Sequence, residues 1–277
     1  MEFLKSEIIF YLSAFACFTA LAFIAKGRLA FQWSEALRNS AVVNFLFIFF
    51  NMIMGMLVLI TVISVENLYS YLGLPMIPPS FWEGWPLIAK ALVFLLVYDF
   101  NVYWVHRWLH KTKWAWPTHA VHHSDTQLHF LSWSRSHFVE LMILFGLLAF
   151  MGRWLGLTVT EIGVFASLRA LHQYYVHAHL NWNHGFLSKV LVSPNYHRWH
   201  HADVEEAYDT NFASIFPFYD IMFGTHYNPG PANDVPTGFD TNPGDDFFKL
   251  VMYPFREWRD MFVNRIRPDS SEPTKTA

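Results

Sequence analysis

Long uncharged stretches dominate the first part of the chain. Residues 8–25 and 41–65 contain no charged residue, and residues 86–105 form a third apolar segment interrupted only by Lys90 and Asp99. A helix needs about 20 apolar residues to cross the hydrocarbon core of a bilayer. Each stretch therefore predicts a membrane-spanning helix. The first is expected to be a retained anchor, because its flanks do not follow the pattern of a cleaved signal peptide.

Two further apolar segments, residues 138–151 and 155–176, are separated only by residues 152–154. This arrangement predicts a helical hairpin that enters and leaves the membrane on the same side. A short aromatic segment follows at residues 212–223. Residues 247–266 mix aromatic and basic positions, which predicts a helix in the membrane interface, interrupted at Pro254. The last ten residues are polar and predict a disordered tail.

The composition supports a membrane protein. Hydrophobic residues make up 53% of the chain and charged residues only 15%, whereas a soluble domain carries about 25% charged residues. A net charge of −3 is too small to imply nucleic acid or any other strongly charged partner, and no nucleic-acid partner is expected. Cys17 is the only cysteine, so neither disulfides nor thiolate metal sites are available.

The basic residues of the loops predict the orientation. The loop at residues 26–40 carries Lys26, Arg28 and Arg38, whereas the loop at residues 66–85 carries no lysine or arginine. The first loop is therefore expected in the cytoplasm and the second outside. We expect an all-α, polytopic membrane helical bundle of about 4–5 membrane helices with a cytoplasmic, histidine-rich helical cap. Its expected parts are transmembrane helices (1–90), a histidine-box catalytic domain with a membrane hairpin at about 138–176 (91–226), and a loop, interfacial helix and polar tail (227–277).

Fourteen of the fifteen histidines lie in two windows, residues 106–137 and 172–201. His106 and His110 are four residues apart, and the sets His119, His122, His123 and His197, His200, His201 repeat the spacing i, i+3, i+4. On a helix each set shares a face, so its rings are expected to converge on a common point. Neutral imidazole is the commonest metal ligand, and eight of them exceed the capacity of one tetrahedral site. The spacing therefore predicts two metals.

The three boxes read HRWLH, HAVHH and HRWHH, in that order. Together with HHSDT at residues 122–126, Arg135-Ser136-His137 and the segment 220–225, they resemble the fatty acid hydroxylase superfamily, also called the sterol desaturase family, from about residue 95 to 226. The resemblance implies a membrane-embedded non-haem diiron centre that uses O₂ to hydroxylate or desaturate a lipid such as a fatty acyl chain or a sterol. It also implies a separate redox partner: a ferredoxin, a cytochrome or a reduced pterin. The iron assignment comes from the resemblance, and zinc can substitute for iron in a structure.

The candidate site residues follow from the boxes and the resemblance. The expected metal ligands are His106, His110, His119, His122, His123, His177, His197, His200, His201 and His137, and the box histidines with Asp99 are the candidate catalytic residues. Asp99 precedes His106 by two helical turns and is expected to accept a hydrogen bond from a metal-bound histidine. Asp125, Glu140, Asp203 and Asp209 are further candidates for that role. His179 and His184 remain open as additional ligands, whereas His129, His172 and His226 are expected to be structural or solvated.

Two other functions compete with a lipid oxygenase. A zinc hydrolase needs the glutamate of HExxH, but Arg107 occupies that position in HRWLH. A metal transporter or haem carrier would hold its ligand near the bilayer midplane, whereas the boxes are expected beyond the spans. The chain is expected to be a multi-pass protein of the bacterial inner membrane, with the endoplasmic reticulum as the alternative. The lipid substrate, and hydroxylation versus desaturation, stay open.

Overall fold

The computed structural model describes residues 34–266 except residue 233, together with seven positions between residues 13 and 24. The predicted anchor at residues 8–25 therefore lies largely outside the described residues, as does the predicted polar tail after residue 266. Across residues 34–266 the structure consists of helices and loops without a β-strand, and a single isolated bridge joins Ala202 to Thr237. The predicted all-α class is confirmed for this part of the chain.

Within the described residues, two helices are long and apolar enough to cross a membrane, α2 (Glu35–Tyr71) and α3 (Leu87–Lys111). Ser34 caps α2 by accepting a hydrogen bond from the Leu37 amide at 3.1 Å. Only 11% of the most apolar window of α2 is buried, and side chains such as Phe49 and Ile53 are exposed. An apolar surface of this extent marks a contact with lipid or with another protein.

The predicted hairpin is present as two helices, α5 (Phe138–Trp154) and α6 (Val159–His177). α6 begins with a capping box, in which Thr158 and Glu161 bond each other's backbone amides. Glu161 also pairs with Lys90 at the start of α3, with 2.8 Å between the carboxylate and Nζ. The turn between α5 and α6 requires glycine at residue 156, because φ is +66° there and a Cβ atom would collide with the carbonyl oxygen of Ile77.

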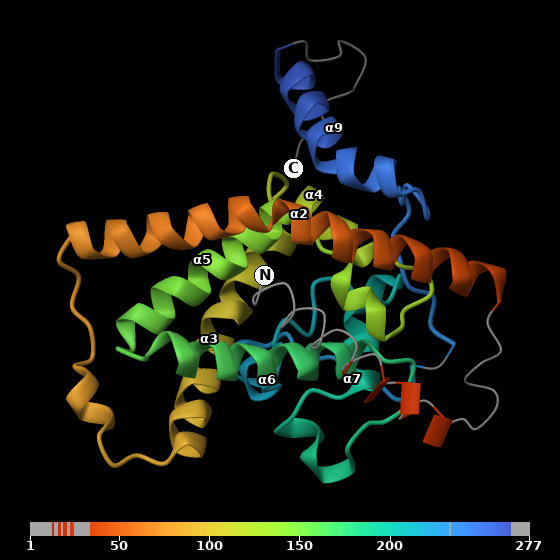
Figure 1. Ribbon diagram of the computed structural model, residues 1–277. Coiled ribbons are helices and arrows are strands. Elements are labelled where there is room, and N and C mark those ends of the chain that lie inside the picture. The colour runs from red at the N-terminus through yellow and green to blue at the C-terminus, as the bar shows by residue number, and fades with distance from the viewer. Residues whose placement is uncertain are drawn as a thin grey trace, which may run out of the picture.

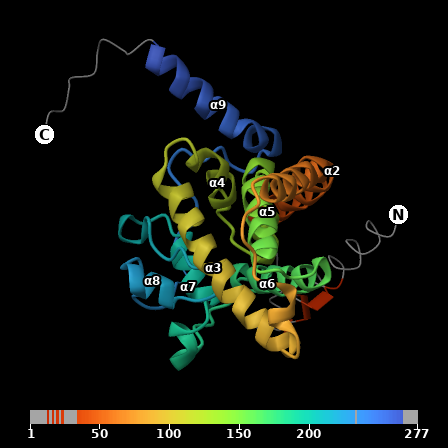
Figure 2. The same cartoon turned by 90° about the vertical axis from the view of Figure 1, so that its left-hand side faces the viewer.

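The helices cross instead of forming a simple up-and-down bundle. Figure 1 shows α2 and α6 with roughly parallel axes and opposite chain directions, α5 packed against α2, and α3 lying crosswise. Figure 2, which looks along α2, shows α3 at length. The loop between α2 and α3 meets the tip of the α5–α6 hairpin: the Ile77 amide donates to the Trp154 carbonyl (2.8 Å), and Trp82 Nε1 donates to the Leu155 carbonyl (2.7 Å). This contact ties the two loops together at one end of the molecule.

Shorter elements lie between the long helices. They are α4 (Trp116–His123), the 3-10 helix η3 (Phe130–Ser134), α7 (Pro194–His200) and α8 (Phe218–Phe223). Further 3-10 turns are η2 (Pro79–Trp82), η4 (Gly185–Lys189) and η5 (Glu205–Ala207). Helix α9 (Phe247–Ile266) matches the predicted bounds, but the helix continues through Pro254, so the predicted interruption was wrong. It packs on α4 and α2 and projects from the body (Figure 1).

Candidate metal centre

Nine histidines from α3, α4, α6 and α7 form two adjacent groups. The five-histidine group consists of His106, His110, His119, His123 and His200, and the four-histidine group of His122, His177, His197 and His201. Within each group the candidate ligand nitrogens all lie within 4.8 Å of one another. The rings of His123 and His201 stack at 4.3 Å where the groups meet. The fold thus gathers all eight box histidines and His177 around two neighbouring positions.

The boxes do not each converge on one point, contrary to the expectation from their spacing. His119 and His123 lie in the five-histidine group while His122 lies in the other, and His200 is separated from His197 and His201 in the same way. A helix turns by about 100° per residue, so positions i and i+4 lie about 40° apart whereas i+3 and i+4 differ by about 100°. Each HxxHH box therefore contributes to both groups.

Backbone carbonyls orient several of these rings. The Nδ1 atoms of His106, His177 and His200 donate to the carbonyls of Phe212 (2.8 Å), Gln173 (2.7 Å) and Thr210 (2.8 Å). A neutral imidazole that donates through Nδ1 keeps a lone pair on Nε2. The Nε2 atom of His177 then faces the Nε2 atoms of His122 at 3.1 Å and His197 at 2.9 Å.

Two further observations fit a metal between these nitrogens. His110 Nε2 is buried without a hydrogen-bond partner, which is costly for an imidazole that has no other ligand. Burial lowers the pKa of His119 to about 3 and, reinforced by neighbouring histidines, holds the pKa values of His197 and His201 well below their usual range. These imidazoles are therefore neutral near pH 7, the form that binds metal.

Glu140, in the first turn of α5, orients His119. The His119 Nδ1–H donates to Glu140 Oε1 at 2.9 Å, and both side chains are buried. A carboxylate in this position fixes the tautomer of a ligand histidine and increases its basicity. Of the carboxylates that the sequence proposed for this role, Glu140 is the one that forms such a bond.

Glu140→Gln should weaken metal binding at the five-histidine group, because the neutral amide is a weaker acceptor for the His119 Nδ1–H. The loss of metal affinity or turnover is expected to be about 10- to 100-fold, typical of such outer partners. Metal content after dialysis against a graded chelator series measures it. Glu83→Gln, at an exposed position, is the matched control; retention of metal by Glu140→Gln at every chelator concentration would contradict the assignment.

Asp99 lies near the centre but bonds no histidine, contrary to expectation. Its carboxylate accepts from the backbone amides of Ser214, Ile215 and Phe216 and from the Ser214 hydroxyl, at 2.6–3.2 Å. Asp220 accepts in the same manner from the amides of residues 212 and 213. Both aspartates thereby hold the 210–216 loop, whose carbonyls orient His106 and His200. Asp99 lies on the same face of α3 as His106, but its carboxylate accepts from the loop amides and not from the His106 ring, because those amides lie within hydrogen-bond distance.

His137 is the one predicted metal ligand that the structure does not bring to either group. It caps α5, with Nδ1 accepting from the Val139 amide at 3.3 Å. Its Nε2 donates to the Val251 carbonyl of α9 at 3.2 Å. Both ring nitrogens are thus occupied at a helix junction close to Pro254, where a proline disturbs the helical hydrogen bonds.

The other expected carboxylates and extra histidines serve local contacts. Asp203 accepts from the Tyr208 hydroxyl (2.6 Å), and Asp209 pairs with Lys111 (2.6 Å) and lies 3.9 Å from His110 Nδ1. His172 and His184 bond the carbonyls of Val192 and Leu191.

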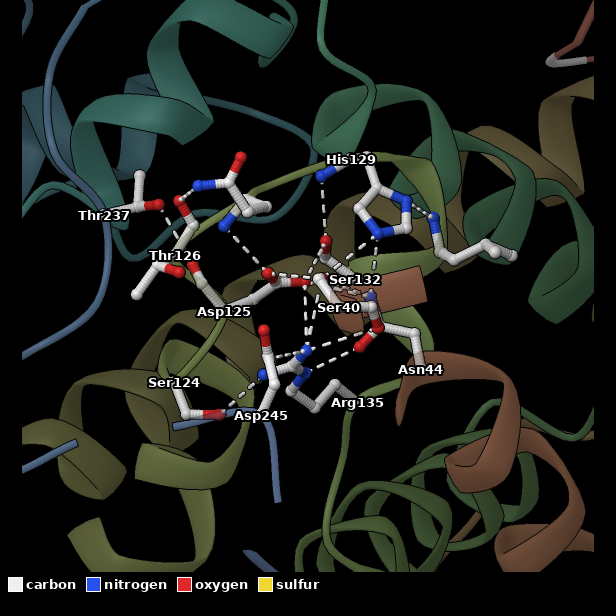
Figure 3. A network of polar contacts seen from close by, with 12 residues as sticks. Ser40, Asn44, Ser124, Asp125, Thr126, His129, Ser132, Arg135, Thr237 and Asp245 are labelled. Carbon is white, nitrogen blue, oxygen red and sulfur yellow. Dashed lines mark hydrogen bonds and ion pairs between the residues drawn. The ribbon is translucent and has the colours of Figure 1, made fainter. Parts of the chain in front are cut away.

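A buried polar network around Arg135 fixes the chain that follows the second box (Figure 3). Arg135 is fully buried. Its Nε donates to Asn44 Oδ1 at 2.6 Å, and its Nη2 donates to Asp245 at 2.8 Å and to Ser40 Oγ at 3.2 Å. Ser40 and Asn44 are one turn apart on α2, so the arginine joins this apolar helix to the histidine-bearing domain.

Asp125, two residues after His123, is the acid at the centre of this network. It accepts from Ser40 Oγ (2.7 Å), Asn44 Nδ2 (2.9 Å) and Ser132 Oγ (2.6 Å). Burial by itself raises the pKa of this carboxyl, but Arg135, His129 and the hydrogen bonds outweigh it and hold the pKa below its usual range. Asp125 is therefore ionised at neutral pH, and it stabilises the end of α4 without bonding a box histidine.

Two cavities open beside the histidine groups. One is lined by His106, His119, His122 and His197 with Glu140, Arg169 and apolar side chains of α3 and α5. The other, of about 370 Å³, is lined by His110, His123 and His200 together with aromatic and acidic residues.

Sequence reasoning assigned no role to Arg169, although a lone arginine in an apolar segment is a functional candidate by default. The sequence also could not show that the backbone carbonyls of residues 210 and 212 orient His200 and His106, because every residue has a carbonyl.

Comparison with known proteins yields one family. Residues 91–225 match the fatty acid hydroxylase family. The chain is 26% identical over 186 residues to the ornithine lipid hydroxylase OlsE of Rhizobium tropici (63% of this chain, 53% of that protein). It is 29% identical over 180 residues to methylsterol monooxygenase 1-3 of Arabidopsis thaliana (64% and 59%) and 31% identical over 166 residues to the alkylglycerol monooxygenase of Xenopus tropicalis (59% and 34%). The chain thus spans about a third to three-fifths of the length of these relatives. No solved structure matches it.

Proposed function

Residues 91–225 belong to the fatty acid hydroxylase family, and from this premise we propose that the chain is an integral membrane diiron oxygenase that hydroxylates or desaturates a lipid. The observation that carries the proposal is the pair of adjacent histidine groups, nine imidazoles in all. Two bound iron ions would supply the activation of O₂ that attack on an unactivated C–H bond requires and that no side chain offers.

The residues present fit two metal ions. The five-histidine group would hold one and the four-histidine group the other, with nitrogen donors throughout. Affinity alone favours copper or zinc over iron at such donors, so the choice of iron rests on the family. Glu140 and the carbonyls of the 210–216 loop keep the rings in the required tautomers and orientations, which limits the reorganisation on metal binding.

The reaction needs an external electron donor. In hydroxylation one oxygen atom of O₂ enters a C–H bond, and the other leaves as water with two electrons and two protons from the donor. In desaturation the substrate loses two hydrogens and both oxygen atoms leave as water, with the same two electrons and two protons. The sequence contains no dinucleotide-binding fingerprint, so we propose a separate ferredoxin, cytochrome or reduced pterin.

We place α2, α3 and the α5–α6 hairpin in the membrane, which with the anchor predicted at residues 8–25 makes about 4–5 membrane helices. The loop between α2 and α3 and the tip of the hairpin would share the outer face, because they bond each other. The histidine groups would lie on the cytoplasmic side, near the basic residues Lys111 and Lys113 that follow the first box. The bacterial inner membrane is the preferred location, and the endoplasmic reticulum is the alternative.

Lipids are the proposed substrates because the names of the relatives refer to an ornithine lipid, a methylsterol and an alkylglycerol. We favour hydroxylation, since these three relatives are named as a hydroxylase and two monooxygenases.

Incubation of the iron-loaded protein with extracted membrane lipids and a chemical reductant, with and without O₂, tests the proposal. We expect lipid products that have gained one oxygen atom or lost two hydrogens, seen by mass spectrometry only in the aerobic sample. Labelled ¹⁸O₂ should place its oxygen in a hydroxylated product. Equal product without O₂ would exclude an oxygenase.

A further inference from the structure

Arg169 is a cation that lines the cavity beside the histidine groups. It lies on α6 and shares the cavity wall with His106, His119, His122 and His197. Its guanidinium carbon is 5.3 Å from the ring centroids of both Tyr98 and Trp133. Two aromatic faces from α3 and η3 thus hold the planar group in place by cation–π attraction.

This cation has no acceptor in the described part of the chain. Its Nε atom is buried without a hydrogen-bond partner, and no carboxylate lies within ion-pair distance of the guanidinium among the described residues. Glu140, the carboxylate of the cavity wall, uses Oε1 to accept from His119, and its Oε2 is also without a partner. Arginine cannot lose its proton, and a buried N–H donor without an acceptor is costly. The site therefore favours a ligand that brings an oxygen acceptor.

We propose that Arg169 binds the carboxylate, or the ester carbonyl, of an acyl lipid whose head enters this cavity. The Nε edge of a guanidinium matches a carboxylate with two parallel hydrogen bonds. The cavity has about 30 Å³, which suits about two water-sized groups such as the two oxygens of a carboxylate but not an alkyl chain. Because the same cavity touches four of the histidines, the carbon attacked lies near the head of the acyl chain and not at its methyl end. This inference rests on the proposed function for the reaction, but the binding of the head group does not depend on catalysis.

Equilibrium binding of radiolabelled palmitate to the detergent-purified, iron-loaded protein tests the proposal, with methyl palmitate and hexadecane as companion probes. Arg169→Gln should weaken palmitate binding by about 10- to 100-fold, as expected for the loss of a hydrogen-bonded charged partner. Arg169→Lys keeps the charge but lacks the planar pair of N–H donors, so an intermediate loss of palmitate affinity is expected. Binding of hexadecane should change by less than about threefold, because it offers no acceptor.

Arg153→Gln is the matched control, since Arg153 lies at the exposed end of α5, 3.9 Å from Glu66. Unchanged melting temperatures would show that the Arg169 variants fold. The proposal fails if the wild type does not bind palmitate more tightly than hexadecane. It also fails if Arg169→Gln binds palmitate with an affinity within threefold of wild type, the result expected if a water and Glu140 are the only partners of this cation. Oxygen-dependent lipid oxidation with Arg169-independent palmitate binding would overturn this inference and leave the proposed function standing. Palmitate binding that depends on Arg169, without oxygen-dependent lipid oxidation, would reject the proposed function and leave this inference standing.

Discussion

His197→Ala should lower the iron content from about two ions to about one per chain and reduce lipid oxidation by at least about 100-fold. The variant removes a ligand from the four-histidine group, whose remaining members are His122, His177 and His201. A change to an outer partner of a metal ligand already costs about 10- to 100-fold, so loss of the ligand itself should cost more. Elemental analysis and product formation on the same purified sample measure both quantities.

His110→Ala is the reciprocal variant, because His110 belongs to the five-histidine group. It should also leave about one metal ion per chain, and the double variant should leave none. His226→Ala is the matched control, since His226 belongs to neither group and its ring lies against Tyr196 at 5.4 Å between centroids. Retention of two metal ions by His197→Ala would contradict the two-group arrangement.

Arg135→Ala should lower the free energy of unfolding by about 3–5 kcal/mol, or prevent stable folding altogether. The substitution leaves Asp125 and the side chains of Ser40 and Asn44 in a buried site without their cation, and breaking a buried ionic network from one side carries a cost of this size. Because the network joins α2 to the segment after the second box, metal content is expected to fall with stability. Denaturant titration in mixed micelles, followed by tryptophan fluorescence, measures the change.

Arg153→Ala serves as the control, because Arg153 pairs with Glu66 at 3.9 Å on an exposed surface. Exposed ion pairs contribute about 0–1 kcal/mol. A loss below 1 kcal/mol for Arg135→Ala would show that the buried arginine is dispensable to the fold.

Much of the helical framework was predictable from hydropathy. The apolar stretches at residues 41–65, 86–105 and 138–176 became α2, α3 and the α5–α6 pair, and α9 has the predicted bounds. The aromatic segment at residues 212–223 carried no prediction of secondary structure, and only Phe218–Phe223 is helical. Its first half is an irregular loop that is stable because Asp99 and Asp220 satisfy its amides, a long-range arrangement that no local pattern encodes.

The candidate site was predictable in its members but not in its arrangement. The boxes identified eight histidines, and the resemblance added His177, all of which lie in the two groups. The same reasoning placed His137 and Asp99 at the centre, whereas one caps α5 and the other holds a loop. Proximity in sequence does not determine what a buried polar group bonds, because it pairs with whichever donor or acceptor the packing brings closest.

By itself the sequence determined that this protein has apolar helices, that histidine is its only plentiful soft-metal donor, and that these histidines sit at helical spacing. Those properties follow from composition and from the period of one helix. The tertiary structure alone decided which histidine joins which group, that Glu140 orients His119, and that Arg169 lies without an acceptor beside them. Such pairings depend on how separate helices cross, and the free energy that selects a crossing comes from the whole buried surface and not from any one segment.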